Sequence, residues 1–222
     1  MTNRSLVPRP VGAALLAVSL VVGGCLGPGT LPTESAAGAS QPVYGDGTCP
    51  TSQPPALPAG EKRTVTIETK LGTIVMAIEA DLAPIAAGNL VALAACGFYD
   101  GVVFHRTPTL EDGTRFVIQG GDPTGTGRGG PGYTIQDEAV VEEYGRGTVA
   151  MARSQAANSV GSQFFIVLED SVRDVLESAN TYQIIGTVAS GMEVADAIHA
   201  ASAGIELPTD PVAMTKVTVT NP

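Results

Sequence analysis

The strongest constraint on the fold is a series of short apolar runs, separated by turns, that continues from residue 61 to the end of the chain. Glycine and proline number 27 and 16, and many of them lie between these runs, where they favour tight turns. Runs this short and this closely spaced are typical of β-strands. The expected strands cover 64–69, 73–78, 102–106, 116–119, 148–153, 163–167, 183–188 and 212–219.

Two segments carry helix signals instead. Asp81 can cap a helix that has Pro84 in its first turn, and Gly97 stands where that helix would end. A second helix is expected over 192–200. Many short strands with two helices predict a mainly β protein, a closed antiparallel β-barrel capped by two helices, built from residues 61–222.

The first 25 residues resemble an export signal. Arg4 and Arg9 precede an uncharged apolar stretch over 11–22, which is too short to span a bilayer comfortably. The stretch ends in Gly23-Gly24-Cys25, which resembles a bacterial lipobox, in which the cysteine is lipidated. This resemblance implies a protein held by lipid on the extracytoplasmic face of the cell membrane. An ordinary secretory signal and an uncleaved anchor are the alternatives.

Residues 26–60 are rich in Gly, Pro, Ser, Thr and Ala and have almost no apolar periodicity. Such a segment buries too little apolar surface to offset its conformational entropy. We therefore expect a disordered tether of this length between the anchor and the folded domain.

Charge and residue type exclude several classes of function. The formal net charge is −10 and the chain has no basic run, which argues against nucleic-acid binding. The chain has two histidines, and neither Cys49 nor Cys96 has metal-like spacing to one of them, so we expect no metal and no cofactor. His199, near the end of the second helix, is expected to be solvated. Gly125–Gly130 fits G-x-G-x-x-G, but Pro131 and Gly132 follow instead of a helix, so we expect a surface loop.

Two segments suggest a binding site without an acid–base pair. Phe104-His105-Arg106 is followed by the run 116–122, and Gly161–Ile166 carries a second Gln and a pair of Phe residues. These residues could converge as one cationic donor, two amides and an apolar floor.

The two segments closely resemble the cyclophilin family of peptidyl-prolyl cis-trans isomerases, over about 64–219. Further matches are Phe98-Tyr99-Asp100-Gly101 and the runs 147–152 and 186–188. The pattern is most similar to the bacterial exported branch. The resemblance implies a monomeric isomerase that acts on X-Pro bonds of exported or unfolded polypeptides and assists their folding. The alternative is a proline-peptide binding module or chaperone with little turnover.

The resemblance also implies roles for individual residues. Arg106 matches the catalytic arginine of the family. The substrate-binding positions that it implies are His105, Phe116, Val117, Gln119, Ala152, Arg153, Ser154, Gln163, Phe165, Leu176 and Tyr182. Val117 replaces a more usual Met, Arg153 a common Asn and Tyr182 a frequent His. The connections 107–115 and 169–181 are longer than usual.

Cys49 and Cys96 remain once Cys25 is acylated. An exported protein lies in a compartment that permits disulfides. We therefore expect these two cysteines to pair, although a free Cys49 in the tether and a buried Cys96 in the helix are the alternative.

Overall fold

A single curled, antiparallel sheet of seven strands forms the centre of the fold. The computed structural model of the protein describes residues 48–179 and 181–221. In the sheet the strands follow the order β3-β5-β4-β6-β2-β1-β7. The strands are β1 Lys62–Thr69, β2 Gly72–Glu79, β3 Val117–Gly120, β4 Thr148–Met151, β5 Phe164–Val167, β6 Ile184–Ser190 and β7 Met214–Thr220. The helices are α1 Pro84–Ala95, the short 3₁₀ helix η1 Asp170–Val172, α2 Arg173–Ala179 and α3 Met192–Ala201.

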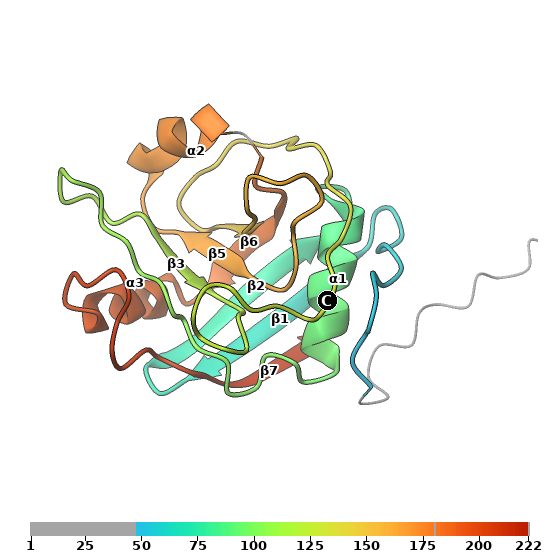
Figure 1. Ribbon diagram of the computed structural model, residues 1–222, viewed down its shortest axis with the longest axis horizontal. Helices are drawn as coiled ribbons and strands as arrows, with labels where there is room; N and C mark the ends of the chain where they lie inside the picture. Colours follow the sequence, from blue (N-terminus) through green and yellow to red (C-terminus); the bar gives the residue numbers. More distant parts are fainter. Residues whose placement is uncertain (1–47, 180, 222) are drawn as a thin grey trace, which may run out of the picture. The chain divides into compact units, whose positions relative to one another are not determined.

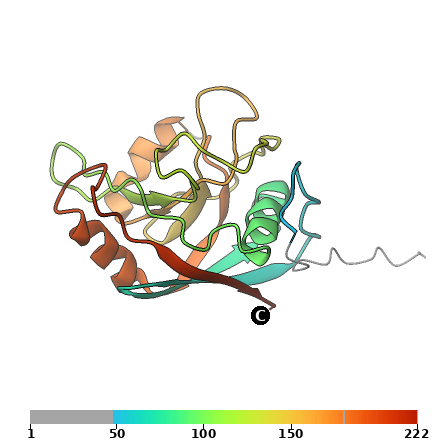
Figure 2. The same cartoon turned by 60° about the horizontal axis from the view of Figure 1, so that its bottom comes forward.

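The long strands show why the sequence folds in this way. Val65 and Ile67 of β1, like Ile74, Met76 and Ile78 of β2, alternate with more exposed residues and point into the core. Since successive side chains of a strand point to opposite faces, this alternation places one apolar face against the helices. Figures 1 and 2 show α1 and α3 toward opposite ends of the curled sheet, with β7 alongside β1.

The expected strand over 102–106 forms only isolated bridges, yet it links both edges of the sheet. Val103 bridges Ala213 just before β7, and Arg106 bridges Gln119 of β3. The backbone N–H of Arg106 donates to the Gln119 carbonyl at 3.2 Å, and the Gln119 N–H donates back at 2.8 Å. The segment therefore brings the two edge strands together and places Arg106 beside β3.

Helix α1 begins as expected near Pro84, but its N-terminus is capped from elsewhere. The carboxylate of Glu138 accepts the backbone N–H groups of Ile85 and Ala86, each at 2.9 Å. Asp81 instead accepts the N–H of Gly60 at 2.7 Å. The expected cap was wrong because a residue more than fifty positions away satisfies the free N–H groups of the first turn.

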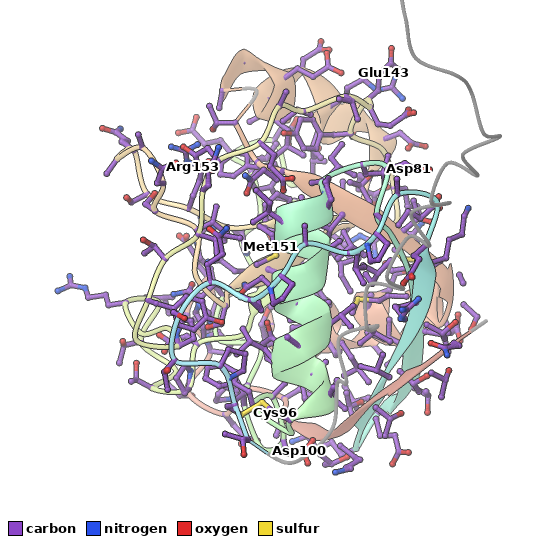
Figure 3. All side chains as sticks on the ribbon, turned by 90° about the vertical axis from the view of Figure 1, so that its right-hand side faces the viewer. Asp81, Cys96, Asp100, Glu143, Met151 and Arg153 are labelled. Atoms are coloured by element: carbon purple, nitrogen blue, oxygen red, sulfur yellow. A yellow bond between two sulfur atoms is a disulfide. The ribbon has the colours of Figure 1, made fainter. Side chains whose placement is uncertain are left out.

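The folded domain begins before residue 61. The boundary between tether and domain therefore lies earlier in the chain than the expected one at residue 60. Residues 48–60 lie along the outer face of α1 (Figure 3). Leu57 is 2 % exposed and its N–H donates to the Pro84 carbonyl at 2.9 Å. A disulfide joins Cys49 to Cys96 at the other end of α1, with 5.1 Å between the Cα atoms. The backbone comes so close to α1 that a Cβ on Gly88 would lie 2.5 Å from the Pro55 carbonyl oxygen. The composition of this segment is that of a linker, but the disulfide and one buried leucine hold it to the domain.

Two further expectations need correction. The connection 169–181 contains η1 and α2, so the described residues form three α-helices where two were expected. His199 is buried, 6 % exposed, and its Nε2 lies 3.2 Å from the Pro108 carbonyl oxygen. The connection 107–115 covers it, which the position of His199 within its own helix does not reveal.

Within residues 48–179 and 181–221, no helix combines the length and the apolar character needed to cross a membrane. The expected signal, the expected lipidation at Cys25 and the first part of the expected tether fall on residues 1–47, outside the described residues.

Candidate active site

Residues expected at the site converge on one small pocket of about 140 Å³. Cavities of about 150 Å³ take up benzene, so this space suits a small apolar ring. The nine residues that line it all belong to the set implied by the sequence. They are Arg106, Phe116, Val117, Gln119, Ala152, Arg153, Phe165, Leu176 and Tyr182.

The apolar floor of the pocket is built by strand pairing. In the register of β3 and β5, Gln119 lies opposite Phe165 and Val117 opposite Val167. Phe165 and Val117 are 4 % and 2 % exposed, and both belong to a second apolar cluster below the pocket. The ring of Phe165 packs edge-on against Tyr182, with 5.4 Å between the ring centroids. The floor is therefore apolar and packed from below by other buried side chains.

Helix α2, which was not expected from the sequence, contributes to the wall of the small pocket. Leu176 of α2 is 3 % exposed and lines the pocket. Tyr182, just after α2, is held because its carbonyl accepts the Tyr144 hydroxyl at 2.7 Å. The longer connection 169–181 thus supplies part of the site.

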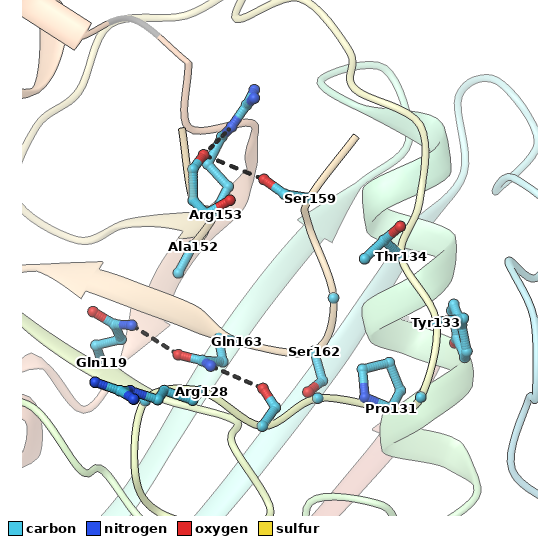
Figure 4. A pocket seen from close by; sticks show the side chains of 16 residues that line it. Gln119, Arg128, Pro131, Tyr133, Thr134, Ala152, Arg153, Ser159, Ser162 and Gln163 are labelled. Carbon is cyan, nitrogen blue, oxygen red and sulfur yellow. Dashed lines mark hydrogen bonds between the residues drawn. The ribbon is translucent and has the colours of Figure 1, made fainter. Parts of the chain in front are cut away.

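A chain of hydrogen bonds orients the polar residues. Arg106 Nη1 donates to Gln119 Oε1 at 3.2 Å, and Gln119 Nε2 donates to Gln163 Oε1 at 2.9 Å. Gln163 Nε2 in turn donates to the Gly129 carbonyl at 2.9 Å (Figure 4). Because each amide donates and accepts along the chain, the Gln119 oxygen is directed at the guanidinium of Arg106.

A larger cavity of about 740 Å³ adjoins the small pocket (Figure 4). The two share Gln119, Ala152 and Arg153, and the larger one also contains Ser154 and Gln163. Together they form a continuous surface on which an extended peptide could lie with one ring in the small pocket.

Arg153 lines both cavities but is already engaged. Its guanidinium forms an ion pair with Asp137 at 3.1 Å and donates to the carbonyls of Ser154 and Ala156 at 3.1 and 2.7 Å. We therefore assign Arg153 to the wall of the site and not to a free charge that awaits a ligand.

The glycine-rich loop beside the larger cavity folds around Asp122. The Asp122 carboxylate accepts the backbone N–H groups of Thr124, Thr126, Arg128 and Gly129. Burial opposes ionisation of this carboxyl, but the hydrogen bonds outweigh it and hold the pKa of Asp122 well below its usual range. The loop's N–H groups therefore already have an acceptor from this chain, which agrees with the expected surface loop.

The structure does not place His105 in either cavity. Its ring is 3 % exposed and lies behind the glycine-rich loop, where a Cβ on Gly127 would be 3.6 Å from Nε2. Burial lowers the pKa of the His105 imidazole, although the attraction of Asp122 opposes that effect. The position next to Arg106 in the sequence suggested a contact with substrate, but successive residues of an extended segment face opposite sides.

We expect catalysis to be nearly independent of pH from mildly acidic to mildly basic pH, because His105 lines neither cavity and the site has no acid–base pair. Stability should behave differently. The unfolded chain binds a proton at His105 near pH 6.5 and the folded chain resists it, so the free energy of unfolding should fall as the pH drops below about 6.5. Turnover and thermal melting measured across this range test both statements. A bell-shaped rate profile with limbs near neutrality would instead mean that a group such as His105 titrates during catalysis.

Sequence reasoning missed one residue at the rim of the site. Glu206, in the connection between α3 and β7, accepts a hydrogen bond from Arg106 Nε at 2.7 Å. No pattern around residue 206 signals this contact, since the two residues are 100 positions apart.

Known proteins are similar to this chain in sequence and in fold. Residues 64–219 match the family described as "Cyclophilin type peptidyl-prolyl cis-trans isomerase/CLD". The peptidyl-prolyl cis-trans isomerase cypE of Dictyostelium discoideum is 38 % identical over 162 residues, which cover 71 % of this chain and 97 % of that protein. Peptidyl-prolyl cis-trans isomerase A of Mycobacterium tuberculosis is 37 % identical over 175 residues, covering 70 % and 91 %.

Solved structures agree with the sequence matches. A crystal structure of a cyclophilin type peptidyl-prolyl cis-trans isomerase of Cryptosporidium parvum, determined in the presence of the dipeptide Ala-Pro, has a TM-score of 0.62 and 31 % identity. The similarity covers 72 % of this chain and 99 % of that one. The fold, the pocket and the matches over most of the domain lead to one conclusion: this chain belongs to the cyclophilin-type peptidyl-prolyl cis-trans isomerases.

Proposed function

We propose that this isomerase accelerates X-Pro isomerisation in exported polypeptides, with Arg106 as the catalytic residue, from a lipid-anchored position outside the cell membrane. The observation that carries the catalytic part is that Arg106 lines the same small pocket as the apolar side chains of Phe116, Val117 and Phe165. The solved relative studied in the presence of Ala-Pro supports a proline peptide as the ligand.

The reaction requires rotation about an amide bond with partial double-bond character, which takes tens to hundreds of seconds unaided. In the twisted transition state the proline nitrogen becomes pyramidal and regains a lone pair. Arg106 can donate an N–H to that lone pair, which is available in neither planar isomer, so it stabilises the transition state above the ground state. No proton is transferred.

The pocket contributes by holding the ring and keeping water away. Val117 and Phe165 of the floor are almost fully buried. Apolar surroundings strengthen the electrostatic contact between the Arg106 charge and the proline nitrogen. The amide of Gln119 and the wall at Ala152 and Ser154 would hold the peptide backbone on the other side of the bond. Both sides of the bond are then held while the amide between them twists.

The isomerisation is tested directly by a protease-free assay. A short peptide with one X-Pro bond is first enriched in one isomer. Its relaxation to the equilibrium mixture of cis and trans forms is then followed with and without the mature protein. We expect relaxation to be accelerated at catalytic concentrations of protein. Binding of the peptide without acceleration would favour the alternative, a proline-peptide binding module.

The location rests on residues outside the described part of the chain and on one feature within it. Residues 1–25 carry the signal pattern that ends at Cys25, and residues 26–47 continue the Gly-, Pro- and Ser-rich composition up to the described part of the chain. The disulfide between Cys49 and Cys96 supports an oxidising compartment, because disulfides persist outside the cytosol and are rare within it.

Changing Cys25 to Ser should release the protein from the membrane fraction or leave its signal uncleaved, since serine cannot carry the thioether-linked lipid. Fractionation and intact-mass measurement of the parent and the variant test this. The double variant Cys49→Ala, Cys96→Ala is the matched control, because it removes cysteines from the folded domain without leaving a single thiol and should leave the anchor in place. An unmodified mature N-terminus at a residue other than Cys25 would rule out the lipid anchor.

A further inference from the structure

The contact between Glu206 and Arg106 suggests that the connection after α3 takes part in catalysis. The Glu206 carboxylate accepts from Arg106 Nε at 2.7 Å, and the backbone beside it is fixed as well. The N–H of Thr107 donates to the Glu206 carbonyl at 2.8 Å, and the Thr107 hydroxyl donates to the Ile205 carbonyl at 3.1 Å. Thr107, which follows Arg106, is thus bonded to the backbone of both Ile205 and Glu206. These bonds hold Glu206 beside Arg106.

The two side-chain contacts of Arg106 fix the plane of its guanidinium. Glu206 binds Nε, and Gln119 binds Nη1 from a different element of the fold. A planar group held at two different nitrogens cannot turn freely about its long stem. These two bonds leave both N–H groups of Nη2 and the second N–H of Nη1 to donate to a substrate.

We propose that Glu206 is a positioning residue that holds the Arg106 guanidinium in the orientation needed to meet the proline nitrogen. This inference rests on the proposed catalytic role of Arg106. A group that donates only in the transition state gains from being oriented beforehand, because no free energy is then spent on ordering it during the reaction.

The ion pair between Arg106 and Glu206 contributes too little to the stability of the fold for that to be its role. The side chains of Arg106 and Glu206 are 35 % and 56 % exposed, and ion pairs this open to solvent contribute little to folding. Glu206 can therefore be changed without unfolding the protein. The charge of the carboxylate has an opposing effect, since it partly offsets the charge that Arg106 presents to the substrate, and the experiment has to separate orientation from charge.

Two substitutions make that separation. Glu206→Ala removes both the acceptor and the charge, whereas Glu206→Gln keeps a carbonyl oxygen for Nε and removes only the charge. We expect Glu206→Ala to lower kcat on the order of tenfold with little change in KM, less than the roughly hundredfold cost of misplacing a reacting group by 1 Å. Glu206→Gln should recover most of the loss. Glu79→Ala is the matched control, because Glu79 forms an exposed ion pair with Lys62 at 2.7 Å in the β1–β2 hairpin.

A double-mutant cycle connects the effect to Arg106. In an Arg106→Ala background, Glu206→Ala should have no further effect on kcat, since the group that it orients is gone. Parental or raised kcat in Glu206→Ala, equal losses in the Ala and Gln variants, or an undiminished loss in the double mutant would overturn the role of Glu206. If Arg106→Ala itself turned over at the parental rate, the catalytic role of Arg106 would fail first, and the inference with it.

Discussion

Arg106→Ala is expected to lower the turnover number by roughly 10²–10³, by analogy with the loss of one preorganised donor in a dry site. Arg106 lines the pocket, and in the proposed mechanism its contact with the proline nitrogen exists only in the twisted state. Removing it therefore takes away transition-state binding and spares most ground-state binding. The apolar floor at Val117 and Phe165 remains, so peptide affinity should change far less than the rate. Isomerisation kinetics and a peptide titration on the same preparations measure the two effects separately.

Arg106→Lys should restore little of the activity. An ammonium group lacks the planar fork through which Arg106 reaches Glu206 and Gln119 at once. The alternative is that Arg106 serves the fold as an ion-pair partner, in which case stability and activity would fall together. The exposed pair with Glu206 supplies about 0–1 kcal/mol at most, so we expect both variants to melt near the parental temperature. An Ala variant that melts normally and still isomerises at the parental rate would refute the catalytic role.

Removing the disulfide should produce the largest loss of stability. Cys49 and Cys96 are 47 residues apart, and the chain-entropy model gives about 4 kcal/mol for closing a loop of this length, as an upper figure. The double variant Cys49→Ala, Cys96→Ala avoids reactive single thiols. Denaturant unfolding of this variant and of the oxidised parent, both with Cys25 removed, measures the difference in the free energy of unfolding.

The same experiment separates the disulfide from the active site. The bridge fixes residues 48–60 against α1, and neither cysteine lines the pockets around Arg106 and Gln119. The folded fraction of the double variant should therefore isomerise peptides at close to the parental rate. Thiol titration of the denatured, unreduced protein gives an independent check, because two free thiols from Cys49 and Cys96 would contradict the bridge.

Much of the fold can be predicted because its signals are local. The alternation in β1 and β2, Pro84 at the start of α1 and glycines at the turns each act on a few neighbouring residues. The parts of the fold that were predicted wrongly lack such local signals. Helix α2 is seven residues long, with one buried residue, Leu176, and a face this short leaves no readable periodicity. Residues 48–60 have the composition of a linker, and only their contacts with α1 make them part of the domain.

The same distinction holds for the site, where some features could be predicted from local motifs and others could not. Arg106, Gln119, Phe165 and the other residues of the small pocket could be named from the sequence, because they lie in short motifs whose order matches a known family. The sequence by itself thus determined the chemistry: one guanidinium, two amides and an apolar floor. It could not determine how these groups are oriented. Glu206 reaches Arg106 across 100 residues, Glu138 caps α1 across more than fifty, and His105 turns away from the pocket although it adjoins Arg106. Such contacts are set by the way the curled sheet brings its edges together, which no local pattern encodes, so only the tertiary structure decided them.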